Sequence, residues 1–295
     1  MKIDLSAYRA QGFLVVEDAL RPAELRDLRA VVDAFIERSR ALERDDSALE
    51  LEAGHSPERP RVRRIKQPHR HDPIFANFYR SASILDPVRA LIGPNLRLIG
   101  SKVNIKGAHT GSSVECHQDR AFYPHTNDDL LAVGVLLDDV GPENAPLLLL
   151  PGSHRGPVHD HTANGVFVGG FNPLQCGLDV GGAVSFTGSA GSISLHHVRL
   201  VHGSAINRSA RDRRMLFVEI GAADAWPLLG VSSYDEWFQG HMISGTPTTS
   251  FRMEALPIRL PLPQAFTGAL SQDATLYRVQ EHLPQRYFHD MDSQR

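Results

Sequence analysis

Apolar side chains after Pro22 recur at the spacing of one face of a helix. They are Leu25, Leu28, Val32, Phe35 and Ile36. Residues three, four and seven positions apart lie on the same side of an α-helix, and proline is tolerated in a first helical turn because its missing N–H has no partner there. The pattern therefore predicts an amphipathic helix that starts near Pro22. A second, shorter helix is predicted for Ile84 to Ile92.

The segment 43–70 has no such pattern. Its first part is acidic and its second part is basic, with prolines at 57, 60 and 68. The arginines and lysine of Arg59 to Arg70 would suit the phosphates of a coenzyme A thioester. A run of basic residues after an acidic run is more typical of a solvated loop that neutralises itself, and we prefer that interpretation. The segment is therefore predicted to be a long loop or lid.

From residue 96 onward the chain is made of short runs of strand-forming residues bounded by Gly, Pro, Asn and Asp. These runs are Leu96 to Lys106, Ser113 to Asp119, Leu130 to Asp138, Leu147 to Leu150, Ala183 to Phe186, Ser192 to His197 and Met215 to Ile220. Short strands without intervening long helices predict an antiparallel sandwich or barrel, and not a parallel βαβ sheet. After Ile220 the pattern weakens, apart from a possible helix near Asp273 to His282.

We expect one domain with three parts. Residues 1–95 form a helical and lid part, 96–221 the β-rich core, and 222–295 a segment that packs on the core. The chain of 295 residues is long enough for a substantial core. Hydrophobic residues make up 42% and charged residues 22%, as in globular proteins, which excludes a disordered or fibrous chain.

Charge and cysteine content narrow the class of protein further. The 31 basic and 34 acidic residues give a net charge of −3, so no overall field would attract nucleic acid or an anionic membrane. Cys116 and Cys176 cannot build a disulfide framework or a four-thiolate zinc site. The N-terminus is too charged for a signal peptide, and runs such as Leu130 to Leu137 are too short for a membrane helix. We expect a cytoplasmic monomer or homodimer whose partner is a small-molecule substrate.

The tripeptide His117-Gln118-Asp119 is a candidate metal site. Side chains at i and i+2 of a strand point to the same face, so an imidazole and a carboxylate could reach one ion. A second imidazole would complete the two-His, one-carboxylate set of non-haem Fe(II) enzymes. His196, His197 and His202 are the candidates for it. Alternatively, His117 is a polar residue at a strand end, satisfied by a backbone carbonyl.

Arginines follow His202 closely, at positions 211, 213 and 214. An oxyacid that chelates iron through a keto and a carboxylate oxygen needs a cation for its distant carboxylate, and a guanidinium can hold that group with two parallel hydrogen bonds. The region after His202 therefore suits a co-substrate of this kind.

Four motifs in order resemble the phytanoyl-CoA dioxygenase family of Fe(II)- and 2-oxoglutarate-dependent oxygenases. They are His117-x-Asp119, then Asn144-Ala145-Pro146-Leu147 leading to Pro151-Gly152-Ser153-His154, then His202-Gly203-Ser204 with Asn207, and then Arg213 eleven residues after His202. The resemblance begins at Gln11-Gly12-Phe13 and runs to about Ile220. It covers most of the chain.

The resemblance implies a double-stranded β-helix, also called a jelly roll, with flanking helices. It also implies that His117, Asp119 and His202 hold the iron and that Arg213 holds the far carboxylate of 2-oxoglutarate. Further residues of the co-substrate pocket would be Ser204, Asn104 and Lys106, although Lys106 could equally be a solvated surface lysine. Halogenating relatives replace the carboxylate ligand by a small residue, so the presence of Asp119 disfavours halogenation.

The implied reaction consumes 2-oxoglutarate and O2, releases succinate and CO2, and oxidises a C–H bond of a small organic molecule in secondary metabolism or catabolism. Hydroxylation is the default outcome, and the sequence does not choose between it and desaturation, epoxidation or cyclisation. An alternative is a non-redox jelly roll that binds Zn(II) or Ni(II), which would not need Arg213 beside the metal. A zinc hydrolase would require a general base that the sequence does not obviously supply.

Other histidines are expected to be structural. His69, His71, His159 and His161 lie in segments expected to be mobile loops, and His154 is expected to shape a turn. Of His196 and His197, we expect His197 to be the better candidate for facing the pocket. Cys116 is expected on the opposite face of its strand, as a small core residue.

Two aromatic segments are placed near the pocket by the sequence. Tyr123 follows the metal motif and is expected at the pocket mouth, where it could contact substrate or 2-oxoglutarate, or pack in a turn. The C-terminal patch of Trp226, Tyr234, Trp237, Phe238, His241 and Met242 could close over substrate or anchor the tail, and packing is the preferred interpretation.

Overall fold

The structure, a computed structural model of the whole chain, describes residues 3–256, 258–260 and 275–293. Its helices are α1 (Leu5–Gln11), α2 (Pro22–Ser39), α3 (Pro73–Tyr79), α4 (Ala82–Ile92), α5 (Leu276–Gln280) and α6 (Tyr287–Ser293). Its strands are β1 (Phe13–Val16), β2 (Leu49–Leu51), β3 (Val62–Lys66), β4 (Leu96–Lys106), β5 (Val114–His117), β6 (Leu130–Leu136), β7 (Leu147–Leu149), β8 (Thr162–Ala163), β9 (Val166–Phe167), β10 (Val184–Phe186), β11 (Ile193–His197), β12 (His202–Ser204), β13 (Arg213–Ala222) and β14 (Met242–Ser244).

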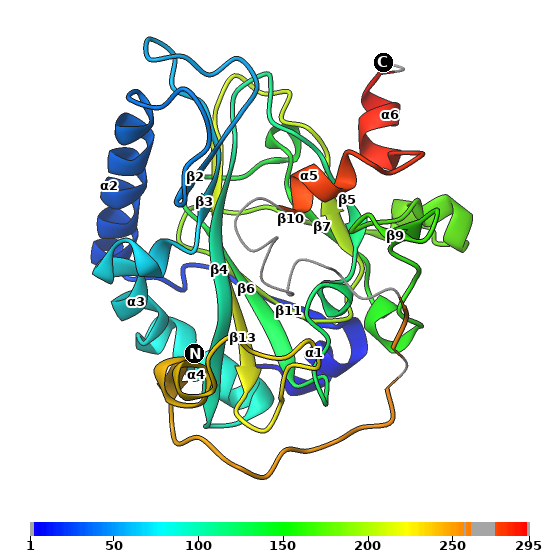
Figure 1. Cartoon of the computed structure of the whole chain (residues 1–295). Helices are drawn as coiled ribbons and strands as arrows, with labels where there is room; N and C mark the ends of the chain where they lie inside the picture. The colour runs from blue at the N-terminus through cyan, green and yellow to red at the C-terminus, as the bar shows by residue number, and fades with distance from the viewer. Residues whose placement is uncertain (1–2, 257, 261–274, 294–295) are drawn as a thin grey trace.

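Two antiparallel sheets face each other and form the jelly roll. The larger has the strand order β1-β11-β6-β13-β4-β3-β2, with β14 on β4, and the smaller has the order β10-β7-β12-β5. Figure 1 shows α2, α3 and α4 on the outer side of the larger sheet and α5 and α6 beside β5 and β7. Every predicted strand run contains an observed strand, and the predicted helices correspond to α2 and α4.

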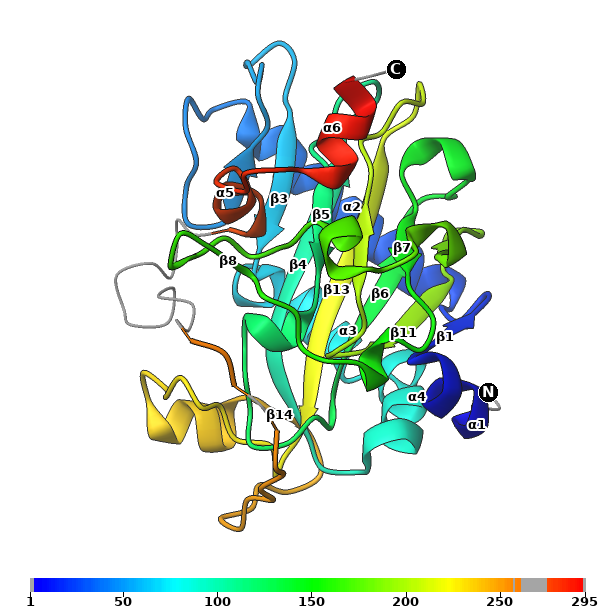
Figure 2. The ribbon, with the colours of Figure 1, turned by 90° about the vertical axis from the view of Figure 1, so that its right-hand side faces the viewer.

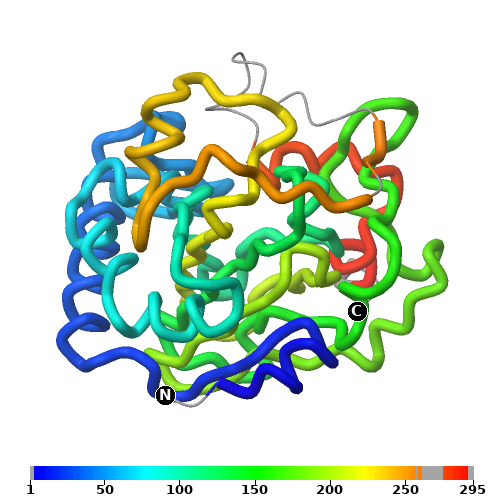
Figure 3. The backbone as a smooth tube through the Cα atoms, turned by 90° about the horizontal axis from the view of Figure 1, so that it is seen from below, coloured from blue at the N-terminus to red at the C-terminus, as the bar shows by residue number. Residues whose placement is uncertain are grey.

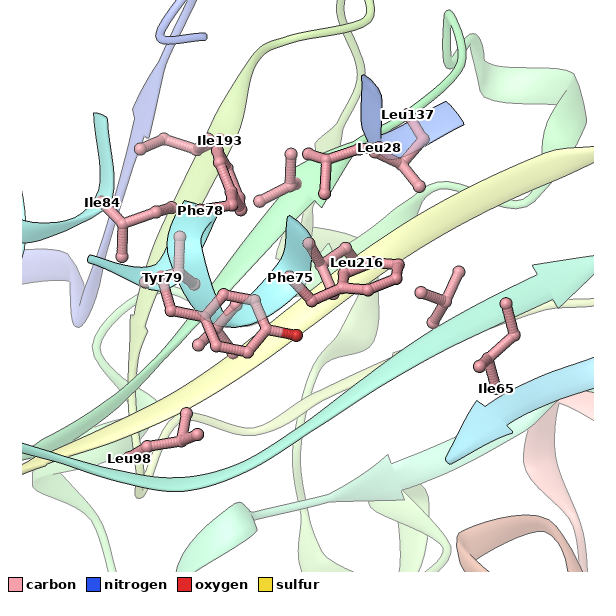
Figure 4. Packing of buried hydrophobic residues seen from close by; sticks show 14 of the residues in the cluster. Leu28, Ile65, Phe75, Phe78, Tyr79, Ile84, Leu98, Leu137, Ile193 and Leu216 are labelled. Carbon is pink, nitrogen blue, oxygen red and sulfur yellow. The ribbon is translucent and has the colours of Figure 1, made fainter. Parts of the chain in front are cut away.

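The main core lies between α2 to α4 and the outer face of the larger sheet (Figure 4). Leu28, Phe75 and Ile84 from the helices meet Val103, Val133, Leu195 and Leu216 from the strands, and all are buried. Side chains alternate along a strand, so the residues between these apolar positions point to the other sheet. A second apolar cluster that includes Leu149, Phe186 and Met215 joins the two sheets. The space between the sheets is therefore where polar inward residues gather.

The prediction of a loop or lid for 43–70 is wrong, because this segment adds two strands to the edge of the larger sheet. Strand β2 pairs with β3, and β3 pairs with β4. The basic run is neutralised within the fold, since Arg63 contacts Glu52 at 2.7 Å and Glu50 at 3.4 Å. Two apolar residues of strand β3, Val62 and Ile65, belong to the core shared with the helices. Strand pairing between these separate segments therefore outweighs the preference for a loop that the local charge pattern indicated.

The C-terminal part of the chain packs on both ends of the core. Viewed from below, the segment 223–256 runs across one end of the sheets (Figure 3). The turned view shows α5 and α6 next to β5 (Figure 2), where Tyr277 and Phe288 are buried. Helix α5 falls within the predicted helix near Asp273 to His282, of which positions 273 and 274 lie outside the described residues. Among the described helices, none has the length and apolar character needed to cross a membrane.

Candidate active site and metal centre

Strands β5 and β12 bring His117, Asp119 and His202 together. The two strands pair antiparallel with His117 opposite His202. Gln118 keeps an extended backbone, so the side chain of Asp119 stays on the side of His117 although Asp119 already begins a short 3-10 turn. Asp119 Oδ1 lies 3.8 Å from His117 Nε2 and 3.9 Å from His202 Nε2. All three residues are buried, and their ligand atoms lie within 4.8 Å of one another.

Backbone carbonyls fix both imidazoles in the orientation that a metal needs. His117 Nδ1 lies 2.9 Å from the Glu115 carbonyl oxygen, and His202 Nδ1 lies 2.9 Å from the Leu200 carbonyl oxygen. Each Nδ1–H donates to a carbonyl, which leaves the Nε2 lone pair directed at Asp119. Burial lowers the pKa of His117, so its imidazole is neutral. Burial alone would raise the pKa of Asp119, but His202, Lys102 and His117 outweigh burial and lower it.

This donor set fits Fe(II). Two imidazole nitrogens and one carboxylate oxygen converge from one side, which is the facial arrangement that leaves coordination positions open. His117 and Asp119 are present in the deprotonated forms that a metal requires. The juxtaposition of His117, Asp119 and His202 predicted from the sequence is thus confirmed, and their role as ligands is taken up below as a proposal.

Four of the predicted co-substrate residues lie beside this set, in a cavity of about 30 Å³. Arg213 is buried and its Nε donates to the Ala145 carbonyl at 3.1 Å. Burial lowers the pKa of Arg213 to about 10, so its guanidinium stays charged. Lys106 is 1% exposed and donates to the Ser204 carbonyl at 3.2 Å. The alternative of a solvated surface lysine is therefore wrong.

Asn104 and Ser204 also line the cavity. Asn104 Oδ1 accepts a hydrogen bond of 3.0 Å from Arg64 Nε, and both residues are buried. The pairing of β4 with β13 sets Lys106 opposite Arg213 and Asn104 opposite Met215. Strand register thus gathers cationic and amide side chains next to the metal centre.

Sequence reasoning missed further residues that line the same cavity. They are Lys102, Val114, Ala132, Leu147, Phe217, Glu219, Leu276 and Tyr277. The sequence did contain a signal for two of them, Lys102 and Glu219. Apolar Val103 and Ile105 mark the outer face of β4, so the period of two that turns Asn104 inward also turns Lys102 inward. Along β13, the same alternation places the side chain of Glu219 on the inward face together with that of Arg213. Leu276 and Tyr277 had no local signal.

The expectation for the adjacent histidines is reversed by the structure. His196 lines the metal cavity, whereas His197 packs against Tyr8 and His154. Ile193 and Leu195 belong to the core on the outer face, which leaves His196 on the inner face of β11. His197 is therefore not the histidine that faces the pocket.

His161 is not in an exposed mobile loop, as expected, but is buried beneath the metal motif. Its Nε2 accepts a 2.9 Å hydrogen bond from the Gln118 backbone N–H, and its Nδ1 lies 2.9 Å from the His159 carbonyl oxygen. This pair of contacts requires a neutral ring protonated at Nδ1. Burial lowers the pKa of His161 to about 4. His161 thereby supports the backbone between the two candidate ligands on β5 and its following turn.

Acid is expected to destabilise the metal-free protein through His161. The unfolded chain binds a proton near pH 6.5 but the folded site resists it down to about pH 4. Stability is thus full above pH 6.5 and falls as the pH drops, by up to about 3 kcal/mol for this residue. Urea unfolding between pH 7.5 and 4 measures the slope. The variant His161→Gln, which cannot be protonated, should have a shallower slope than the wild type, and an equal slope would contradict the assignment.

A larger cavity of about 540 Å³ adjoins the metal centre at Tyr123. His69 and His71 line it, with His69 Nδ1 held 2.7 Å from Ser101 Oγ, so they are part of a cavity wall. Burial and the Asp119 carboxylate raise the pKa of Tyr123 well above its ordinary value. Tyr123 is thus partly buried in the wall of this cavity and close to Asp119.

The C-terminal aromatic patch packs on the core, as preferred, and two of its residues also line a cavity. Trp237 and His241 line the larger cavity. The buried Arg97 anchors the same segment, since its Nε donates to the Trp237 carbonyl at 2.9 Å. Cys116 is a small core residue beside Phe171, Val201 and Phe288, as expected. Ser153 holds the turn that contains His154 by accepting from the Val201 N–H.

Comparisons with known proteins agree with this site. The sequence profile of the phytanoyl-CoA dioxygenase (PhyH) family matches residues 8–215. The chain is 34% identical over 285 residues to the probable alpha-ketoglutarate-dependent hypophosphite dioxygenase of Stutzerimonas stutzeri, covering 95% of this chain and 97% of that protein. It is 28% identical over 231 residues to L-proline trans-4-hydroxylase of Streptomyces griseoviridis, covering 72% and 82% of the two chains.

Solved structures share the fold. The crystal structure of EctD from S. alaskensis with bound Fe superposes with a TM-score of 0.63 at 24% identity and covers 85% of each chain. The jelly-roll fold predicted from the sequence is thus confirmed.

Proposed function

The chain belongs to the phytanoyl-CoA dioxygenase family, and from this premise we propose which of its residues carry out the reaction. It is a non-haem Fe(II)- and 2-oxoglutarate-dependent dioxygenase that uses O2 and releases succinate and CO2. The observation that carries the residue assignment is the convergence of two imidazoles, one carboxylate and one buried guanidinium on a single cavity between the sheets.

His117, Asp119 and His202 would hold the iron, which supplies the activation of O2 when it is bound. The carbonyl contacts of the two Nδ1 atoms keep the imidazoles from turning away. Hydrogen bonds from the ring nitrogen that does not face the metal orient histidine ligands and make them stronger bases. The chain thus presents a prearranged set of ligands.

Arg213 would bind the far carboxylate of 2-oxoglutarate, assisted by Ser204, Asn104 and Lys106. A guanidinium matches a carboxylate with two parallel hydrogen bonds, and burial strengthens such a pair. Arg213 belongs to β13 and Asn104 and Lys106 to β4, so the neighbouring strands fix their spacing. Tyr123 contributes by separating the metal centre from the outer cavity.

The substrate would be a small molecule that is hydroxylated. Two relatives are named for hypophosphite and L-proline, both far smaller than a coenzyme A thioester. The basic run that would suit a coenzyme A phosphate is held by carboxylates, as in the contact of Arg63 with Glu52. The alternative of a non-redox metal-binding protein finds no support in these relatives, which are named as dioxygenases and hydroxylases.

Anaerobic addition of Fe(II) and then 2-oxoglutarate to the metal-free protein is expected to produce a visible charge-transfer band, since a chelated oxoacid and an Fe(II) centre would share the cavity. His202→Ala should lack the band while keeping the fold. Admission of O2 should yield succinate from the wild type only. Folded, iron-loaded protein without a band would contradict the proposal and favour non-redox metal binding.

A further inference from the structure

A group of polar side chains that the iron and 2-oxoglutarate do not require lies next to Asp119, on the inner face of the larger sheet. Pairing across β11, β6, β13 and β4 aligns His196, Ala132, Glu219 and Gly100 in one row. Lys102 follows in the next row on β4, and its ammonium lies 2.6 Å from Glu219 Oε1. Figure 1 shows these strands running side by side. Ala132 is small and lies between His196 and Glu219, so the row is low between these two polar side chains.

His196 has no hydrogen-bond partner on either ring nitrogen among the described residues, although its side chain is fully buried. Buried polar groups in folded proteins are nearly always paired, because an unpaired one loses its hydration without compensation. His196 Nε2 lies 4.0 Å from Asp119 Oδ2, whereas Oδ1 is the oxygen that faces His117 and His202. His196 is thus beside the metal set and not one of its members, and its free nitrogens call for a bound molecule.

The Lys102 and Glu219 pair also needs an explanation, because moving two charges out of water is costly. The two partners are not equally enclosed. The Glu219 side chain is 7% exposed and Lys102 is 24% exposed, so the ammonium is the end that reaches open space. Glu219 takes one of the three ammonium donors and holds the rest of the group in place. The pair therefore presents a positive charge toward the cavity.

Charge balance favours an anion at this place. Among the described residues that line the metal cavity, the cations are Lys102, Lys106 and Arg213, and the carboxylates are Asp119 and Glu219. A divalent metal and a 2-oxoglutarate dianion would cancel each other. The loaded site would keep one positive charge, which a monoanion would neutralise. The outer cavity has the same bias, since Lys66 and Arg70 line it together with the single carboxylate of Glu236 among its described lining residues.

We propose that Lys102 and His196 bind the oxyanion group of a compact, singly charged substrate beside Asp119, and that Glu219 positions Lys102. This inference rests on the proposed function, since the substrate lies next to the metal. The oxyanion would be a phosphinate or a carboxylate. Both offer the ammonium and the imidazole N–H an acceptor oxygen while leaving a hydrogen-bearing atom close to the metal.

The test measures binding without turnover. Protein saturated with Fe(II) and 2-oxoglutarate under anaerobic conditions is titrated with the monoanions hypophosphite and acetate, and with acetamide as the uncharged match of acetate. The Kd comes from the shift of the charge-transfer band and from calorimetry. At least one of the anions should bind more than tenfold tighter than acetamide. Preference for hypophosphite identifies a phosphinate, and preference for acetate a carboxylate.

Variants assign that binding to the named residues. Lys102→Met keeps the length of the side chain without its charge. It should raise the Kd of the preferred anion roughly tenfold to hundredfold. Lys102→Arg should restore most of the affinity. His196→Phe, on another strand, keeps an aromatic ring without the nitrogens and should also raise the Kd of the anion. In all three variants the Kd of 2-oxoglutarate should stay within about twofold of the wild type. Arg89→Met, at an exposed site on α4, should change neither Kd.

The outcomes separate the two proposals. An absent charge-transfer band would overturn the proposed function before any anion is added. A normal band that neither anion shifts, or an affinity for both anions no greater than that for acetamide, would overturn only the inference about the substrate. If Lys102→Met fails to fold, His196→Phe and Lys102→Arg still test the inference about the substrate. Unchanged anion affinity in His196→Phe would show that His196 takes no part.

Discussion

Asp119→Asn is expected to abolish oxygen-dependent succinate formation and to leave the protein almost unable to retain Fe(II). Asparagine has the same shape, but it removes the negative charge on which both ligand imidazoles converge at 3.8 and 3.9 Å. Removing one member of a buried charge pair costs about 3–5 kcal/mol. That range corresponds to roughly 10²- to 10⁴-fold weaker metal binding. Iron per chain after desalting, the charge-transfer band and succinate formation measure the effect.

Asp27→Asn is the matched control, because Asp27 is a half-exposed residue on α2 that contacts only its neighbour Arg26. It should retain iron and activity like the wild type. The thermal stability of metal-free Asp119→Asn is expected to fall, since His202, Lys102 and His117 outweigh the desolvation of the carboxylate and stabilise its charged form. Full iron content in Asp119→Asn would contradict the role of Asp119 as a ligand.

Arg213→Ala is expected to raise the Kd of 2-oxoglutarate roughly 10²- to 10³-fold, because a buried carboxylate would lose its guanidinium partner. Fe(II) binding should remain, since Arg213 does not contact the three ligand atoms. Anaerobic titration of the charge-transfer band with 2-oxoglutarate gives the Kd directly. High 2-oxoglutarate concentration should recover much of the turnover, which separates this variant from Asp119→Asn.

Arg213→Lys controls for loss of packing, because Arg213 is also held by the Ala145 carbonyl. The lysine keeps the charge but loses the forked geometry, so its Kd should lie between those of the wild type and Arg213→Ala. Thermal stability of each variant is measured alongside. An unchanged co-substrate affinity in folded Arg213→Ala would refute the assignment. The carboxylate would then have to be held by other cations of the cavity, of which Lys106 is the nearest across the strands.

The metal centre could be predicted from the sequence because its information is local. The pair His117 and Asp119 depends only on the alternation of an extended backbone, and the structure retains that alternation through Gln118. The strands β4, β6, β11 and β13 are equally readable, since every second residue is apolar and packs under the helices. The distance along the chain from His202 to Arg213 also follows from the motif. The role of Arg213 in binding 2-oxoglutarate, by contrast, was inferred from the family resemblance.

The residues that surround the centre depended on which strands become neighbours. Lys102 and Glu219 are 117 positions apart and meet only because β4 pairs with β13. His196 was passed over for His197, although the apolar residues Ile193 and Leu195 place it on the inner face once β11 is known to be covered by helices.

Sequence alone thus determined the β-rich class, the amphipathic helix after Pro22 and the metal motif, because these follow from periodicities over a few residues. Only the tertiary structure decided that 43–70 is an edge of the sheet, that His161 supports the metal motif, and that Tyr277 from α5 closes the cavity. Each of these depends on hydrogen bonds or burial between distant segments, where the free energy of pairing outweighs the preference of the local residues.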